Sequence, residues 1–338
     1  MKFKIAKLYF KGPLALMDKK KDEFVKEVWK LPSDKLKGAM AYALDALGYK
    51  VEDFWDNVIV SSAFPFWDGE QTFYYFPKPM IKLPVKPSDN LQHAKNIKKI
   101  RFLEKSLFEK VINDEEFDLY EDAEFLEGKK FIAPPGILNG KTKVHLMKSQ
   151  AEGKIALGNI YNVGSEAKPA PYYVSRTFFN PEKSGLYFLF EGDEEWVKKA
   201  LDFFKDEGIG ADKTYGNGEL RDFKIDEMNL NIPDETNGHI SLSKYIPAED
   251  EIRTLLHSRF SIGKYGGFIA GARNENLRHW SKQSVWMIDE GAFLASTEKP
   301  NGKYVNVVDS ESENALGHPV WREGRPFTIP VNIKKLDT

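Results

Sequence analysis

Four glycines and the polar residues between them are the part of this chain whose types and spacing best fit a binding role. Within eleven positions the sequence places Gly208, Gly210, Lys213, Thr214, Tyr215, Gly216 and Gly218. Glycine adopts positive φ without steric cost and lets another backbone come close. Successive N–H groups in such turns form concave nests that bind anions. The pattern predicts an anion-binding loop with Lys213 as its cation and Tyr215 as a stacking surface. A long flexible turn is the alternative.

The segments on either side of this loop predict the elements that position it. Residues 185–191 form an unbroken apolar and aromatic run, which is typical of a strand covered on both faces. Asp193 is expected to cap the following helix, and Gly208 to end it. A further strand is expected to reach Asp226. Because the loop follows a helix C-terminus, the helix dipole opposes an anion here, so the nest, Lys213 and Arg221 would have to supply the binding.

The patterns that would indicate catalysis are incomplete. Residues 136–142 read Gly-x3-Gly-Lys-Thr, one residue short of a Walker A loop, and strand-like alternation follows instead of a helix. The six histidines show no metal-binding spacing. His145, near Lys148, has the chemistry for metal-free RNA cleavage as a general acid or base, or for contacting a phosphate. We expect the contact role, and hence no catalytic residue, no metal site and no cofactor.

Composition favours a soluble, cytoplasmic protein of two domains. The 338 residues are 41% hydrophobic and 13% aromatic, enough for substantial cores. The absence of cysteine excludes disulfides and thiolate metal sites. The sequence has neither a signal-peptide pattern at its start nor a long apolar run. The net charge of −2 excludes a generally basic coat, but residues 78–110 are rich in Lys and Arg, and such a local track can bind phosphates.

The order of expected elements is typical of an α+β, ferredoxin-like layer with a long insertion. A strand at Lys2–Phe10 and a helix at 34–47 capped by Ser33 come first. Strands at 58–63 and 72–76 follow, and the strand–helix–strand of 185–226 completes the layer. The insertion, at about 77–184, is expected to contain one helix over Asn96–Ile112 and a hairpin turn at Asn139-Gly140. After a linker at 229–237, strands are expected at 239–245, 254–262, 268–272, 284–289, 304–308 and 326–333.

A set of short motifs, taken in order, makes the chain resemble a known family. Ser33-Asp34-Lys35-Leu36 opens the first helix, and Tyr75-Phe76-Pro77-Lys78-Pro79 precedes the Lys-rich 98–103. Further motifs lie at 61–66, 208–218, 261–267, 290–293 and 318–324. No single motif is specific, but the ordered set covers nearly the whole chain. It resembles subunit four of type III-A CRISPR (Csm) complexes, a RAMP protein of the Cas-five group.

The resemblance implies a fold and a function. The fold is two ferredoxin-like, RRM-like domains: residues 1–228, with the insertion and a β-hairpin thumb, and residues 238–338. The function is that of a non-catalytic subunit of an antiviral ribonucleoprotein. Such a subunit holds the 5′ repeat-derived tag of the CRISPR RNA and bridges the large polymerase-like subunit to the backbone RAMP subunit. Two alternatives stay open: a metal-independent CRISPR-repeat endoribonuclease on the same plan, and the equivalent subunit of a type III-B complex.

The residues that we expect to contact RNA combine the loop with basic and polar positions elsewhere. They are Ser33, Lys35, Lys78, His145, Lys148, Arg176, Gly208, Gly210, Lys213, Thr214, Tyr215, Gly216 and Gly218. Single-stranded RNA held in an open form requires N–H groups or cations on its phosphates and aromatic rings under its bases. This set supplies both kinds of contact.

Overall fold

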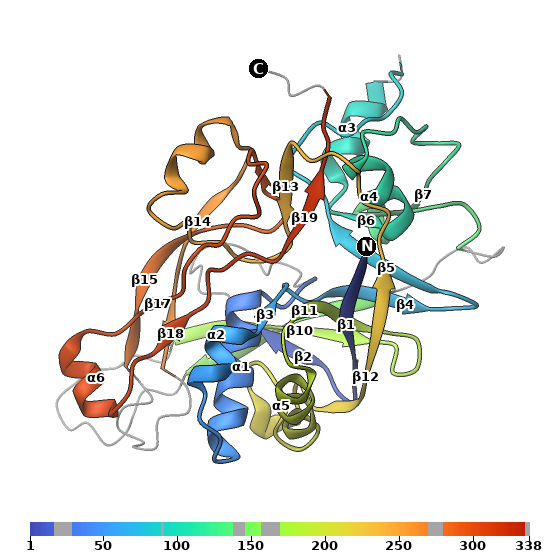
Figure 1. Cartoon of the computed structure of the whole chain (residues 1–338). Coiled ribbons are helices and arrows are strands. Elements are labelled where there is room, and N and C mark those ends of the chain that lie inside the picture. Colours follow the sequence, from blue (N-terminus) through green and yellow to red (C-terminus); the bar gives the residue numbers. More distant parts are fainter. Residues whose placement is uncertain (17–28, 89–90, 138–145, 157–169, 270–279, 335–338) are drawn as a thin grey trace.

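The structure is a computed structural model, and it confirms the α+β class. It describes residues 1–16, 29–88, 91–137, 146–156, 170–269 and 280–334. A large, mostly antiparallel sheet crosses the molecule, and smaller sheets lie around it (Figure 1). Within the described ranges, no helix is long and apolar enough to cross a membrane.

One half of the large sheet follows the β-α-β-β-α-β order. Its strands lie in the order β12 (Leu220–Asn229), β1 (Lys2–Phe10), β11 (Ser184–Glu191) and β4 (Phe64–Asp68), and the short β3 (Ile59–Val60) also pairs with β11. Helices α1 (Ser33–Ala46) and α5 (Glu194–Glu207) cover one face. The alternation of β1 explains this, because Ala6, Leu8 and Phe10 all join the core cluster under the two helices.

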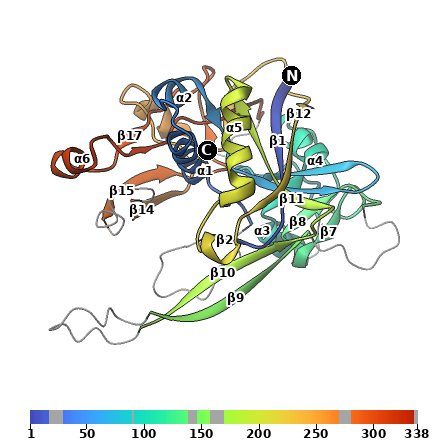
Figure 2. The same cartoon turned by 90° about the horizontal axis from the view of Figure 1, so that it is seen from below.

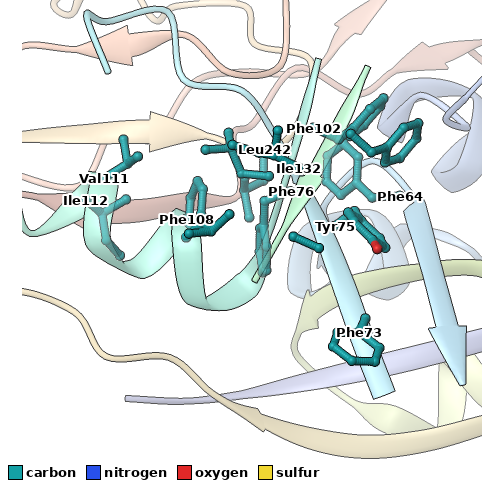
Figure 3. Packing of buried hydrophobic residues seen from close by; sticks show 14 of the residues in the cluster. Phe64, Phe73, Tyr75, Phe76, Phe102, Phe108, Val111, Ile112, Ile132 and Leu242 are labelled. Atoms are coloured by element: carbon teal, nitrogen blue, oxygen red, sulfur yellow. The ribbon is translucent and has the colours of Figure 1, made fainter. Parts of the chain in front are cut away.

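The other face of β1 contributes to a second core. Phe3, Ile5 and Tyr9 pack there, in a cluster that also contains residues of the insertion and of the C-terminal strands. The sheet continues through β5 (Thr72–Pro77), β6 (Phe102–Glu104), β8 (Phe131–Ala133) and β7 (Glu124–Leu126). Figure 3 shows Phe108, Val111 and Ile112 of the helix that follows β6 packed on this side, near Phe76 and Leu242.

The prediction of a single helix over Asn96–Ile112 is wrong. The chain forms α3 (Leu91–Lys99), then β6, then α4 (Lys105–Ile112). The apolar spacing runs on through the break, but β6 pairs antiparallel with β5 and parallel with β8, and those bonds replace a helical turn. The carboxylate of Glu104 accepts the N–H of Ser106 and begins α4 as its N-cap. A short 3₁₀ turn, η1 (Glu127–Lys129), connects β7 to β8.

A long two-stranded ribbon extends from the body of the molecule (Figure 2). Strands β9 (Met147–Ala156) and β10 (Ala170–Phe179) pair antiparallel along their full length, and β2 (Leu14–Leu16) pairs with the base of β10. This ribbon lies in the insertion, where the family resemblance implies a hairpin thumb. The hairpin turn expected at Asn139-Gly140 falls outside the described residues.

The C-terminal part consists of short sheets. Its elements are β13 (Gly238–Ser241), β14 (Ile262–Phe268), β15 (Ser281–Ile288), β16 (Phe293–Leu294), β17 (Val305–Asn306), α6 (Ser310–Leu316), β18 (Trp321–Arg322) and β19 (Thr328–Val331). The expected strands at 239–245, 284–289, 304–308 and 326–333 are confirmed as β13, β15, β17 and β19, with shifted ends. The strand expected at 268–272 lies earlier, because β14 ends at Phe268, and residues 270–272 are outside the described ranges. A second ferredoxin-like domain, with a boundary at 228–238, stays a prediction.

The prediction of a strand at 254–262 is wrong. Residues Ile252–His257 form the 3₁₀ helix η3. The carboxylate of Glu251 accepts the N–H groups of Ala248 and Gly302, which holds the chain in a compact turn. Ile252, Arg253, Leu256 and His257 are exposed and the two residues between them are half-buried, so burial does not alternate as it would along a strand.

Buried ion pairs join α1 and the segment before it to the C-terminal part. The amino group of Lys37 lies 2.5 Å from a carboxylate oxygen of Glu323, and both side chains are fully buried. Lys30 lies 2.5 Å from Glu290, and Lys244 lies 3.3 Å from the same carboxylate oxygen. Helix α2 (Glu52–Asn57) ends beside this join, where Lys37 also donates to the carbonyl of Trp55.

The electrostatics of Glu290 follow from this arrangement. Burial raises the pKa of its carboxyl, but the ammonium groups of Lys30 and Lys244 outweigh burial and hold the pKa well below its ordinary value. The hydroxyl of Ser62 donates a further hydrogen bond of 2.5 Å to the same carboxylate. Glu290 is therefore a charged group in the interior, and its charge is stabilised by residues from both ends of the chain.

Candidate functional site

The glycine-rich loop lies where the sequence predicts, between α5 and β12. The carboxylate of Asp193 accepts the N–H of Glu195 and caps α5, and the helix ends at Glu207, just before Gly208. All four glycines of the loop have positive φ, between +69° and +102°. The loop therefore needs glycine for its backbone conformation at each of these positions.

Much of the backbone of this loop is used inside the protein. The N–H of Ala211 donates to the carbonyl of Ala15 at 2.8 Å, and that of Gly218 donates to Pro13 at 2.8 Å. The N–H groups of 209, 215 and 216 donate to other carbonyls of the loop. These five donors are not available to an anion, so the nest that the glycine spacing predicts is mainly a device for packing the loop onto residues 12–16.

The space around each glycine shows which loop glycines allow close packing inside the protein and which one lies at the surface. A Cβ on Gly210 would lie 2.5 Å from the carbonyl oxygen of Ala15, and one on Gly218 would lie 1.8 Å from that of Ile209. These two glycines permit contacts within the protein. A Cβ on Gly216 would meet only a carboxylate oxygen of Glu219, at 3.9 Å. Gly216 is therefore the loop glycine that borders open space.

The side chains of the loop are more accessible than its backbone. The ring of Tyr215 is 74% exposed, and Thr214 is also exposed. The amino group of Lys213 lies 5.1 Å from the centre of the Tyr42 ring on α1, which is a cation–π distance. An aromatic ring and a cation thus stand next to each other on the outer side of the loop.

The structure brings the base of the β9–β10 ribbon next to the loop. Arg176 of β10 pairs with Ala15 of β2, whose carbonyl accepts the N–H of Ala211. Arg176 forms an ion pair of 2.8 Å with Glu152, and its Nε has no hydrogen-bond partner in the part of the chain that the structure describes. Lys148 is exposed on β9. Alternation places it on the same face of the ribbon as Arg176.

One aromatic residue of this face escapes the sequence analysis. Phe178 pairs with Lys148 across the ribbon, and 38% of its surface is exposed. A signal was present, because Arg176 and Phe178 are two positions apart in a strand and must share a face. The Ala15–Ala211 hydrogen bond joins the two segments that carry Lys148, Arg176, Phe178, Lys213 and Tyr215, and we call this set of residues the loop–ribbon surface.

Three of the expected RNA contacts lie elsewhere. Ser33 is buried, and it does not cap α1 as predicted, because Pro32 is the N-cap and the Ser33 hydroxyl accepts the N–H of Lys244. Lys35 is exposed on α1. Lys78 is half-buried and donates from its amino group to the carbonyl of Ile97 at 2.8 Å; burial, together with the nearby Arg101, lowers its pKa. His145 falls outside the described residues.

No group of three or more acidic or histidine side chains that could hold a metal occurs among the described residues. The loop–ribbon surface likewise offers cations, hydroxyls and aromatic rings rather than carboxylates in a cluster. What this arrangement can do chemically is to bind an extended anion with flat, stackable groups.

Comparison with known proteins shows a similarity to Csm4 proteins. Residues 234–331 match the family model of the CRISPR Csm4 C-terminal domain. Over 319 residues the chain is 24% identical to the CRISPR system Cms protein Csm4 of Thermococcus onnurineus (strain NA1), covering 89% of this chain and 91% of that protein. The chain is therefore similar to Csm4 proteins over most of its length. Csm4 of Methanocaldococcus jannaschii is 22% identical over 316 residues, covering 78% of this chain and 80% of that protein.

Solved structures of Csm4 share the fold. In a Csm3–Csm4 subcomplex of the type III-A CRISPR-Cas interference complex, the matched chain has a TM-score of 0.63 at 18% identity, and the match covers 98% of this chain and all of the other. In a Csm1–Csm4 cassette in complex with cA4, the TM-score is 0.59 at 20% identity, with 99% of this chain and all of the other covered. The chain therefore shares its fold with these two Csm4 chains.

Proposed function

We propose that this chain is the non-catalytic, RNA-binding subunit of a type III-A effector complex and that it holds the 5′ repeat-derived tag of the CRISPR RNA. The observation that carries the proposal is the convergence of the glycine-rich loop with the base of the β9–β10 ribbon. These two segments are distant in the sequence and meet through residues 12–16.

The chemistry of the loop–ribbon surface suits single-stranded RNA. Bases stack on exposed aromatic rings with little sequence preference, and Tyr215 and Phe178 are exposed. Phosphates bind to cations, for which Lys148 and Lys213 are suited. The tag would cross from the loop to the ribbon, which acts as the thumb.

The partners proposed are a Csm1-type large subunit and a Csm3-type backbone subunit. Solved structures of similar chains are described as a Csm3–Csm4 subcomplex and a Csm1–Csm4 cassette. This chain would bridge two such subunits in the cytoplasm.

We also propose that residues 1–228 and 238–338 are two RRM-like domains. The C-terminal sheet of β13, β16 and β19 supports the second domain. Because the ion pairs of Lys37 and Glu290 cross between the two regions, they are expected to unfold together, as one calorimetric transition.

The test is to co-express the chain with Csm1-type and Csm3-type partners and a CRISPR array, purify it by a tag, and sequence the 5′ ends of the bound RNA. Enrichment of one uniform repeat-derived 5′ end supports the proposal. Random 5′ ends contradict it. Co-purification with type III-B partners in place of the Csm-type subunits would assign the chain to that complex.

Gly216→Val is the sharpest variant for this surface. The new side chain would project into open space and obstruct RNA, but it would also strain a residue whose φ is +74°. Gly317→Val is the matched control, because Gly317 has φ +80° and no atom within 4 Å of an added Cβ, and it follows α6, far from the loop (Figure 1). Weaker binding in Gly216→Val alone supports the proposal. Equal binding in both variants and the parent would remove the loop from the site.

The endoribonuclease alternative is tested with the same protein. Repeat RNA should stay intact with and without divalent metal. Specific cleavage that disappears in His145→Ala would replace the proposed function with an enzymatic one.

A further inference from the structure

A hollow lined by cations lies in the insertion, away from the loop–ribbon surface. It has a volume of about 490 Å³ and is lined by Lys95, Lys98, Lys99, Arg101, Gly128 and Lys130. In Figure 1 the helix that carries three of these residues, α3, lies at the opposite end of the molecule from α5 and the loop that follows it. We call this feature the basic hollow.

Four of the five cations that line the basic hollow make no ion pair or side-chain hydrogen bond within the described part of the chain. Lys95, Lys98, Lys99 and Arg101 are exposed, and among the described residues no ion pair or side-chain hydrogen bond is recorded for any of these four. Lysines three and four positions apart on a helix repel each other and destabilise it. An anionic ligand would remove that repulsion.

The base of the hollow is held rigidly. The N–H of Arg101 donates to the carbonyl of Lys130 at 2.7 Å, and the amino group of Lys78 ties the end of α3 at Ile97. Glu127, Gly128 and Lys129 have successive φ values of +47°, +65° and +72°. Residues other than glycine rarely adopt this left-handed conformation, and such strain concentrates at ligand-binding sites.

The composition of the hollow favours nucleic acid over a protein partner. Protein interfaces are depleted in lysine, whereas interfaces with nucleic acid are strongly positive. An exposed ring lies close by: Tyr120 is 45% exposed, and its hydroxyl accepts a hydrogen bond from Asn96, whose side-chain oxygen accepts one from Lys129. A ring beside several cations is the combination that binds single strands.

We propose that the basic hollow binds the phosphodiester backbone of single-stranded RNA, as a second contact separate from the loop–ribbon surface. This inference rests on the proposed function, because it assumes that the chain is an RNA-binding subunit. It adds a site on the insertion that binds the RNA strand through electrostatic contacts. Lys98 and Lys99 each contact a phosphate, and binding there is insensitive to base sequence.

The experiment compares two double variants of the full chain. Lys98→Gln/Lys99→Gln removes two charges from the hollow, and Lys50→Gln/Arg253→Gln removes two exposed charges elsewhere. Binding of a fluorescent RNA that contains the tag and an adjoining spacer is measured from about 0.05 to 0.5 M salt. For single strands each phosphate contact contributes about 0.7 to the salt slope, so the first variant should lose about 1.4 units and bind about 25-fold more weakly near 0.1 M. The control should match the parent.

Four outcomes separate the proposals. The expected loss in the hollow variant, additive with the effect of Lys213→Gln, supports a second site. A hollow variant that binds RNA like the parent overturns the basic hollow and leaves the proposed function standing. If that variant instead fails to co-purify with Csm1-type or Csm3-type partners, the hollow is a protein surface. A parent chain that binds no RNA at the lowest salt overturns both proposals.

Discussion

The lysines of this molecule fall into two regions that use the same side chain in opposite ways. At the join between α1 and the C-terminal part, Lys37 and Lys244 are buried and each meets a carboxylate within 2.5 Å. In the basic hollow, Lys98 and Lys99 are exposed and have no recorded carboxylate partner among the described residues. The first set completes its interactions when the chain folds. The second set can pair with a ligand or another molecule. An exposed lysine without a partner inside the protein is therefore the feature that indicates a binding site.

Removing a buried lysine should have the largest effect. Lys37→Met would remove one of the two cations that contact the Glu323 carboxylate, leaving Arg325, and would take a donor from the carbonyls of Trp55 and Val58. We expect a loss of about 2–4 kcal/mol in the free energy of unfolding, measured by denaturant titration. Lys99→Met, in the hollow, is the matched control and should change little. A similar loss in both variants would break the comparison between the two regions.

Glu290→Gln tests the same join from the acidic side and adds a dependence on pH. We expect a loss of about 2–3 kcal/mol near pH 7, because the glutamine keeps a hydrogen bond to Ser62 but loses its charge. The pKa of Glu290 is lowered in the folded state, so its contribution is present above the unfolded pKa of about 4.3 and disappears as the pH falls.

The pH measurement uses urea titrations of both proteins between about pH 7 and pH 3. The parent should lose stability more steeply below about pH 5 than Glu290→Gln does, so the difference between them narrows. Parallel curves over the whole range would mean that Glu290 carries no stabilised charge.

Lys213 is intermediate between the two regions. Its amino group contacts the Tyr42 ring, so Lys213→Gln should cost about 0.5–1 kcal/mol in stability. The same variant should lower the salt slope of RNA binding by about 0.7. Thermal unfolding and RNA titration at two salt concentrations check both values. An unchanged slope would place Lys213 with the lysines that serve only the fold.

The smallest effect on stability is expected in the basic hollow. Lys98→Gln/Lys99→Gln should change the free energy of unfolding by no more than about 0.5 kcal/mol, because exposed side chains without partners contribute little. A slight gain is consistent with relief of repulsion along α3. A loss of several kcal/mol would show that these lysines serve the fold after all.

The sequence predicts best where a signal is local. Strand β1, the Asp193 cap and the glycines that need positive φ all follow from residues that act on their immediate neighbours. The phosphate-binding role that the basic track at 78–110 indicates stays a prediction. Such features depend on propensity and spacing rather than on distant contacts.

Long-range contacts explain what sequence alone misses. The helix predicted over Asn96–Ile112 is broken because β6 finds partners in β5 and β8. Lys37 reads as a solvated helix residue until Glu323, 286 positions away, is placed beside it. The glycine spacing predicts an anion nest, yet the N–H groups of Ala211 and Gly218 donate to Ala15 and Pro13. In each case the deciding partner is remote in the chain.

The β9–β10 ribbon also acts as a lever. Ten residues of strand span about 33 Å, so a tilt of about 10° at Met147 would move Ala156 by about 6 Å. The pivot of this lever is small, since three residue pairs join β10 to β2 and the glycine loop backs β2. A change at Gly210 would therefore act on the aim of the ribbon as well as on local packing. The packing of the loop therefore affects the direction in which the far end of the ribbon points. In the proposed complex with RNA, that direction would determine which nucleotide the far end meets.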